Sequence, residues 1–174
     1  MAAAQATGER GDALLDLYDR ALPQVYGYLV TRCGDEALGE DLTAEAFLAA
    51  VDAVKRDAVP DLTIAWLVGV ARHKLVDHWR RREREDRKLA LVHADTVDAE
   101  EVPWDARLDA ARARDVLEAM GPHHRGALTL RYLDGLSVPE VAEHLGRTVH
   151  ATEALLVRAR TAFRRRYEGG SDDA

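Results

Sequence analysis

The spacing of apolar side chains constrains this chain most, because it fits helices in every segment that shows a pattern. Apolar residues recur three and four positions apart, and no window sustains the alternation typical of a half-buried strand. Residues that favour helix ends interrupt this pattern at Gly34-Asp35, Pro60-Asp61, Gly121-Pro122 and Asp134-Gly135. We therefore predict an all-α fold, with helices over residues 12–32, 36–55, 61–87, 106–120, 123–133, 137–145 and 148–167.

A stretch with weak periodicity separates two groups of predicted helices. It includes Pro103, and from Asp95 to Asp105 it holds five acidic and no basic side chains. We predict an acidic linker over residues 89–105, between a three-helix domain (12–88) and a four-helix domain (106–168). Residues 1–11 lack the basic and apolar parts of a signal peptide, so they and residues 169–174 are expected to be disordered tails.

Charge is distributed unevenly along the chain. The net charge of −7 argues weakly against a nucleic-acid-binding protein. However, residues 72–88 hold eight basic and four acidic side chains, a local net charge of +4, and residues 158–167 hold five arginines and no acid. Two basic stretches with an acidic one between them suit a protein that contacts nucleic acid twice.

Cysteine content and hydropathy indicate the compartment. The single cysteine, Cys33, excludes an internal disulfide and fits a reducing cytoplasm. No apolar run approaches the roughly 20 residues that span a bilayer, so we expect no membrane insertion.

A helix-turn-helix pattern lies between Ser137 and Tyr167. Ser137 and Glu140 have the spacing of a capping box, in which each side chain satisfies a backbone amide of the other residue. Gly146 tolerates a positive φ and so permits a sharp turn before a longer, basic helix from about Thr148. This is the arrangement of DNA-binding helix-turn-helix proteins. A solvated basic face without a ligand remains the alternative for this segment alone.

The second helix of this pattern has two distinct faces. Arginines on its outer face can pair with phosphates or guanine edges. The predicted core face carries Val149, Thr152, Leu156, Ala159 and Phe163, and the outer face carries His150, Ala154, Val157, Arg158, Thr161 and Arg165.

The helix predicted from Asp61 also has a distinctive outer face, which combines aromatic and basic residues. Stacking of bases on aromatic rings beside cations is how proteins bind single-stranded nucleic acid. A second helix covering Trp66 would explain the pattern without a ligand. The predicted core face holds Ile64, Leu67, Val68, Ala71, Leu75 and Trp79, and the outer face holds Trp66, Gly69, Val70, His73, Asp77 and Arg80.

Three motifs in order resemble the sigma-70 family of RNA polymerase sigma factors, specifically its extracytoplasmic-function (ECF) class. Residues 41–48 resemble region 2.2, residues 65–82 resemble regions 2.3 and 2.4, and residues 130–160 resemble region 4. The resemblance covers about residues 13–87 and 106–167. It implies a non-enzymatic subunit, without a cofactor, that binds core RNA polymerase, recognises the −10 and −35 promoter elements and promotes promoter melting.

The resemblance also implies candidate site residues. Region 2.2 implies contact with the polymerase clamp helices through Asp41, Thr43, Glu45, Phe47 and Leu48. Regions 2.3 and 2.4 imply contact with the −10 element through Asp61, Trp66, Arg72, His73, Lys74, Asp77, Arg80, Arg81 and Arg82. Region 4 implies contact with the −35 element through Arg147, Thr148, His150, Ala151, Glu153, Ala154, Arg158 and Arg165, and with the polymerase flap.

The residues themselves leave two readings of the region 2.2 motif. Asp41 and Glu45 are four positions apart, so they share a helix face that suits a basic helical partner. A solvated acidic face with Phe47 in the core explains them nearly as well.

Two positions depart from the family's pattern. His73 stands where the family commonly has asparagine, so its preference for a base can differ. Glu153, Ala154 and Leu155 replace the polar and basic residues usual at the first DNA-facing turn of region 4. Glu153 repels phosphates but can accept a hydrogen bond from cytosine N4. Leu155 is hypothesised to contact a protein instead, for example an anti-sigma factor.

Two other classes of protein compete with this interpretation. A helix-turn-helix transcription regulator acting without core polymerase would not need residues 41–48. A helical metalloenzyme is disfavoured, because the pairs His73/His78 and His123/His124 lack the spacing of four that places two ligands on one helix face. We expect no bound metal and a cytoplasmic protein, monomeric when free, whose partners are core polymerase, promoter DNA and a cognate anti-sigma factor.

Overall fold

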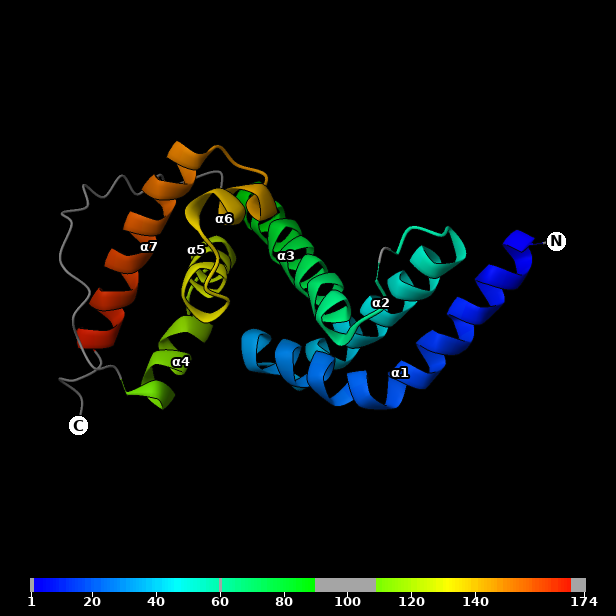
Figure 1. Ribbon diagram of the computed structural model, residues 1–174. Coiled ribbons are helices and arrows are strands. Elements are labelled where there is room, and N and C mark those ends of the chain that lie inside the picture. Colours follow the sequence, from blue (N-terminus) through cyan, green and yellow to red (C-terminus); the bar gives the residue numbers. More distant parts are fainter. Residues whose placement is uncertain (1, 60, 90–108, 170–174) are drawn as a thin grey trace. The chain divides into compact units, whose positions relative to one another are not determined.

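The computed structural model describes residues 2–59, 61–89 and 109–169 (Figure 1). Every regular element in these ranges is a helix, which confirms the predicted all-α fold. The elements are α1 (Ala2–Cys33), α2 (Glu36–Lys55), α3 (Ile64–Leu89), α4 (Ala110–Glu118), α5 (Pro122–Leu128), the π-helix η1 (Thr129–Leu133), α6 (Val138–Leu145) and α7 (Val149–Gly169).

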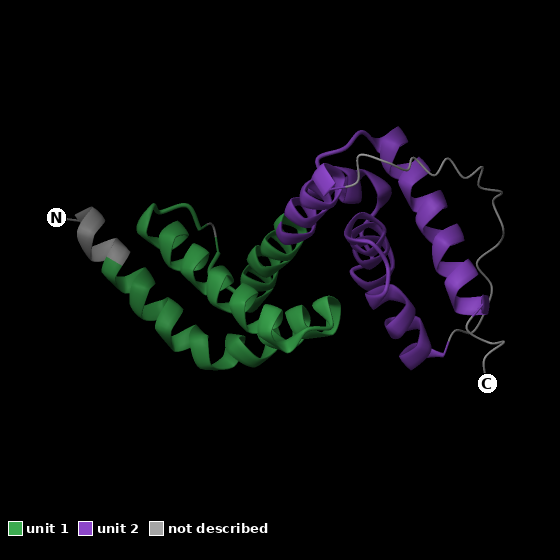
Figure 2. Ribbon diagram, turned by 180° about the vertical axis from the view of Figure 1, so that it is seen from behind, with its two compact units in different colours: residues 1–77 green, residues 78–174 purple. Residues whose placement is uncertain are grey.

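The chain forms two compact units, Met1–Asp77 and His78–Ala174 (Figure 2). The C-terminal part of α3 belongs to the second unit, although residues 12–88 were predicted to form one domain. Apart from Leu89 and Gly169, which end helices, the predicted linker and C-terminal tail lie outside the described residues. None of the described helices is long and apolar enough to cross a membrane.

In unit 1, α1 and α2 pack side by side. Buried side chains recur every four residues on each helix, and the small alanines among them let neighbouring backbones approach closely. The Asp35 side chain caps α2 by accepting a hydrogen bond from Leu38 N at 2.9 Å. The core rows are Ala21, Val25 and Leu29 on α1, Leu42, Ala46 and Ala50 on α2, and Leu67, Ala71 and Leu75 on α3.

Two predicted helix starts in unit 1 are wrong. Helix α1 already begins at Ala2, and the alanine-rich residues 2–6 explain this, since alanine has the highest helix propensity. Helix α3 begins at Ile64, because the Thr63 hydroxyl caps it by accepting a hydrogen bond from Trp66 N at 3.1 Å. Asp61 therefore lies before the helix.

Unit 2 contains the helix-turn-helix, and its capping signals are confirmed. Ser137 N donates to Glu140 Oε2 at 2.7 Å, and the reciprocal bond to the serine hydroxyl is also present. Gly146 adopts φ 62°, so α6 ends in a left-handed turn that favours glycine. Helix α7 packs against α5 and α6. The core includes Met120, Leu128, Ala159 and Phe163, flanked by partly buried Ala113, Val116, Leu117, Ala162 and Tyr167.

Candidate nucleic-acid and protein interfaces

The motif on α2 presents most of its predicted site residues at the surface. Asp41 is exposed, Glu45 is half-buried, and the Leu48 side chain is 66% exposed. Phe47 is half-buried and packs edge-on against Tyr18 of α1, with 4.8 Å between ring centroids. Thr43 is different: its side chain is buried, and its hydroxyl donates to Gly39 O at 2.7 Å. The prediction that Thr43 contacts a partner directly does not fit this burial, because Thr43 lies on the core side of α2.

Helix α1 adds residues that the sequence analysis missed. Leu15 is 71% exposed and Tyr18 is also exposed, beside Phe47 of α2. Leu15 and Tyr18 lie three positions apart, each one position beyond the buried Leu14 and Leu17. That spacing, which widens the apolar stripe past the core, was the available signal. We call Leu15, Tyr18, Phe47, Leu48 and Val51 the α1–α2 apolar surface.

The outer face of α3 within unit 1 is accessible, as its aromatic and basic pattern predicted. Trp66 is half-buried, while His73 and Asp77 are exposed. Lys74 is half-buried, and its Nζ lies 3.9 Å from Glu45 Oε2 of α2. A predicted DNA contact and a predicted polymerase contact are therefore neighbours within unit 1. Asp61, before the helix, is exposed too.

An aromatic ring of α1 joins this basic face. The Arg32 guanidinium lies over the Tyr28 ring, 3.9 Å from its centroid, and that of Arg72 lies 6.0 Å from the same centroid. Cations over an aromatic face are held by its quadrupole. Forty-four positions separate Tyr28 from Arg72, so no local pattern could have revealed this cluster.

The end of α3 takes part in the packing of unit 2. Trp79 is buried, as predicted, but against α5: a Cβ on Gly126 would lie 3.1 Å from its Cε3 atom. Arg80 is half-buried beside the turn between α6 and α7, where a Cβ on Gly146 would lie 2.8 Å from its Nη2 atom. Of the three consecutive arginines predicted to contact the −10 element, Arg81 and Arg82 are exposed and Arg80 is not.

Helix α7 exposes a polar and basic face. Thr148 caps the helix through a 3.1 Å hydrogen bond from Ala151 N to its hydroxyl. His150, Glu153, Ala154, Arg158 and Arg165 are exposed, and Ala151 is half-buried. The face differs from the predicted one at two positions, since Val149 is exposed and Leu155 is only 2% exposed. The hypothesis that Leu155 contacts another protein is therefore wrong, because its side chain belongs to the core.

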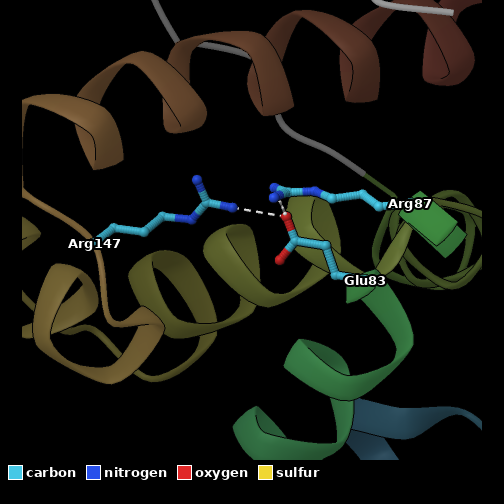
Figure 3. Close-up of polar contacts among 3 residues, drawn as sticks. All are labelled: Glu83, Arg87 and Arg147. Atoms are coloured by element: carbon cyan, nitrogen blue, oxygen red, sulfur yellow. Dashed lines mark hydrogen bonds and ion pairs between the residues drawn. The ribbon is translucent and has the colours of Figure 1, made fainter. Parts of the chain in front are cut away.

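Arg147, between α6 and α7, is held within unit 2 (Figure 3). Its Nη2 atom donates to Glu83 Oε1 of α3 at 2.7 Å. Arg87, one turn further along α3, pairs with the same carboxylate oxygen. One carboxylate thus pairs with two guanidinium groups, and the three side chains together keep a net charge of +1.

A histidine pair lies at the start of α5. The rings of His123 and His124 are 4.2 Å apart between centroids. Burial, and then His123, Arg158 and Arg166, lower the pKa of His124 to about 4. Burial also lowers the pKa of His123, although Glu83 opposes that shift. Within the ranges that the structure describes, no group of three or more His, Cys, Asp or Glu side chains could hold a metal ion.

The chain matches two protein-family models. Residues 17–85 match the family model for sigma-70 region 2, and residues 110–163 match that for sigma-70 region 4. The chain is 33% identical to the ECF RNA polymerase sigma factor BldN of Streptomyces coelicolor, over 89% of this chain and 60% of that protein. It is 30% identical to the RNA polymerase sigma factor CarQ of Myxococcus xanthus, over 75% of each chain.

Solved structures share the fold. CnrH, in complex with the cytosolic domain of CnrY, aligns over 99% of this chain and 96% of its own length, with a TM-score of 0.54 and 25% identity. The sigma factor RpoE of Bartonella quintana, in complex with the anti-sigma factor NepR, aligns over 90% of this chain and 97% of its own, with a TM-score of 0.54 and 20% identity.

Proposed function

Because this chain belongs to the ECF class of the sigma-70 family, we propose that it is an alternative sigma factor that directs core RNA polymerase to promoters. The single observation that carries the proposal is the accessible aromatic and basic face of α3 within the region 2 match. A regulator that used only its helix-turn-helix would have no need of this face. The chain spans 60% of the length of BldN.

Polymerase binding is assigned to unit 1. The α1–α2 apolar surface offers exposed Leu15, Tyr18 and Leu48 beside the acidic Asp41 and Glu45. Apolar anchors rimmed by charge are typical of protein interfaces. We propose that unit 1 binds the clamp helices of core polymerase through their basic residues. The proposed partner of unit 2 is the polymerase flap.

Promoter melting is assigned to the outer face of α3. Extruding a base from the duplex costs a few kcal/mol, which stacking and phosphate contacts must offset. Trp66 and His73 supply ring surfaces, and Arg72, Lys74, Arg81 and Arg82 supply positive charge. Arg32 and Tyr28 extend this surface onto α1.

Recognition of the −35 element is assigned to α7. Its N-terminus supplies backbone amides and the adjacent Arg147, and its exposed face carries His150, Arg158 and Arg165. Glu153, on the first exposed turn, is proposed to contact cytosine, because its carboxylate accepts a hydrogen bond from cytosine N4 but repels phosphate.

The remaining assignments concern chemistry and regulation. We propose that the protein acts in the cytoplasm, is monomeric when free, and contributes no catalytic group, cofactor or metal to transcription. A cognate anti-sigma factor is proposed as its regulator, since both structural neighbours above were solved as complexes, one of them with a named anti-sigma factor.

In vitro transcription with bacterial core polymerase tests the proposed function. We expect this chain to form a stable complex with core enzyme and to direct transcripts from specific fragments of a genomic promoter library. If adding the chain yielded neither a complex nor any promoter-dependent transcript, the sigma-factor proposal would fail. Palindrome binding without core polymerase would favour the helix-turn-helix regulator instead.

A further inference from the structure

Glu83 of α3 lies among basic side chains of unit 2. Its side chain is 14% exposed, and its carboxylate pairs with Arg87 and Arg147 (Figure 3). The charge of Glu83 also raises the pKa of His123, whereas the charges of Arg87, Arg147 and Arg158 lower it. A carboxylate so placed is the local counter-charge for several cations, and its removal leaves them facing one another.

Arg147 is the more informative of the two arginines that Glu83 holds. It directly follows Gly146, whose positive φ ends α6, and it directly precedes Thr148, which caps α7. An arginine at the N-terminus of a recognition helix is positioned for DNA phosphate, because the helix amides and dipole also favour an anion there. Its Nη2 atom is instead bonded to Glu83 at 2.7 Å, and its side chain is only 25% exposed.

Arg80, three positions before Glu83 on α3, lies beside the glycine that precedes Arg147. Its guanidinium lies against Gly146, where a Cβ would approach Nη2 to 2.8 Å. Trp79, the residue before Arg80, is buried and packs on Gly126 of α5. Two arginines predicted to contact DNA, Arg80 and Arg147, are therefore engaged inside unit 2, while Arg81, Arg82, Arg158 and Arg165 remain exposed.

We propose that Glu83 is an intramolecular competitor of DNA phosphate for Arg147, so that the helix-turn-helix binds DNA fully only when this ion pair opens. The inference rests on the proposed function, since it takes α7 to be the DNA-reading helix. A carboxylate offers a guanidinium two oxygens, as a phosphate does. The competition lowers the affinity of the free chain for DNA. Binding that separates Arg147 from Glu83 removes this penalty.

The test measures binding of the full chain to a fluorescent 24-base-pair duplex of mixed sequence, because phosphate contacts do not depend on sequence. Glu83→Gln removes the charge with little change of shape and is expected to tighten binding about two- to fivefold, the range of a partly exposed ion pair. Glu85→Gln makes the same change of net charge at an exposed position two residues further along α3, and is expected to leave the affinity close to that of the unaltered chain.

The Arg147→Ala background separates competition from general electrostatics. There we expect Glu83→Gln to gain no more than Glu85→Gln, because Arg147 is gone and Arg87, the other arginine paired with Glu83, is already 67% exposed. The proposal is overturned if Glu83→Gln binds no more tightly than Glu85→Gln, or if its gain persists without Arg147. If Glu83→Gln does not fold, as judged by circular dichroism, Glu83→Asp takes its place. That variant keeps the charge but withdraws the carboxylate, so it too must tighten binding.

Failure of this inference is distinguishable from failure of the proposed function. A chain that directs transcription with core polymerase, but whose DNA affinity is indifferent to Glu83, remains a sigma factor in which the ion pair is purely structural. A chain that neither directs transcription nor binds any duplex, with or without Glu83, overturns both.

Discussion

The ring of Phe47 packs edge-on against the ring of Tyr18, 4.8 Å apart between centroids, and so joins α2 to α1 beside the exposed Leu48. This contact explains why the acidic motif on α2 cannot be understood from α2 alone. The neighbouring helix α1 adds the exposed apolar side chains Leu15 and Tyr18 to this surface.

We expect Leu48→Glu to weaken binding to core RNA polymerase by about tenfold or more, because it puts a charge at the centre of an apolar contact. Fold stability should hardly change, since the side chain is already exposed. Competition against a labelled sigma factor for core enzyme measures the effect. Leu89→Glu, at an exposed leucine outside the α1–α2 apolar surface, is the matched control and should compete normally.

Trp66→Ala is expected to reduce promoter melting about tenfold, since stacking on an aromatic ring contributes about 1–3 kcal/mol per base. Permanganate reactivity of unpaired thymines in the initiation complex reports melting directly. Trp66→Phe keeps a stacking surface and should retain most of the signal. Normal melting by the alanine variant would exclude Trp66 from the contact with single-stranded DNA.

Glu153→Lys is expected to raise non-specific DNA affinity, because it replaces a charge that repels phosphate with one that attracts it. A salt titration should show a dependence steeper by about one released counterion. The same substitution at the exposed Glu168, near the end of α7, controls for net charge. An unchanged salt dependence for Glu153→Lys would place Glu153 outside the DNA interface.

His124 makes the stability of unit 2 depend on pH. Its pKa is about 4 in the folded chain, against 6.5 for an unperturbed histidine, so the unfolded chain binds more protons between these values. Stability is therefore full above pH 6.5 and falls as the pH drops towards 4. After allowance for partial exposure, we expect a loss of about 1–2 kcal/mol. Urea unfolding across this range should show a flatter profile for His124→Gln, whereas His150→Gln, at an exposed position, should follow the unaltered chain.

Ser137→Ala is expected to lower the free energy of unfolding by about 1 kcal/mol, because it deletes the hydroxyl of the capping box at the start of α6. Urea denaturation measures the change. Ser137→Thr keeps a capping hydroxyl and should recover most of the loss. Equal stabilities for the alanine and threonine variants would show that this cap contributes little.

Local signals in the sequence predicted the helices well. The capping box at Ser137, the left-handed Gly146 and the core positions Leu67, Ala71 and Leu75 all follow from spacing and backbone preference, and the structure confirms them. The helix starts at Ala2 and Ile64 were missed. The high helix propensity of alanine and the Thr63 cap decide where these helices begin, and the prediction relied instead on helix-end residues such as Pro60-Asp61.

The candidate sites were less predictable, because they depend on contacts distant in sequence. Val149 was expected in the core and is exposed, whereas Leu155 was expected at the surface and is buried. Periodicity alone does not fix the edge of the buried face of α7, because packing against α6 decides which residues are covered. Glu83 carries no sequence signal at all: it is one acid in a run of mixed charge. Its importance becomes visible when folding brings it to Arg147, 64 positions away.

The π-helical turn at Thr129–Leu133 sets the direction of the helices that follow it. Asp134 N donates to Thr129 O at 3.0 Å, five residues back instead of four, so the turn holds one residue more than an α-helical turn. Deleting one residue there would return the turn to α-helical spacing. It would also rotate everything that follows by about 100° relative to α5. The number of residues in this turn thus sets the direction of α6 and α7, and a single residue gained or lost there would disrupt the packing of α7 against α5.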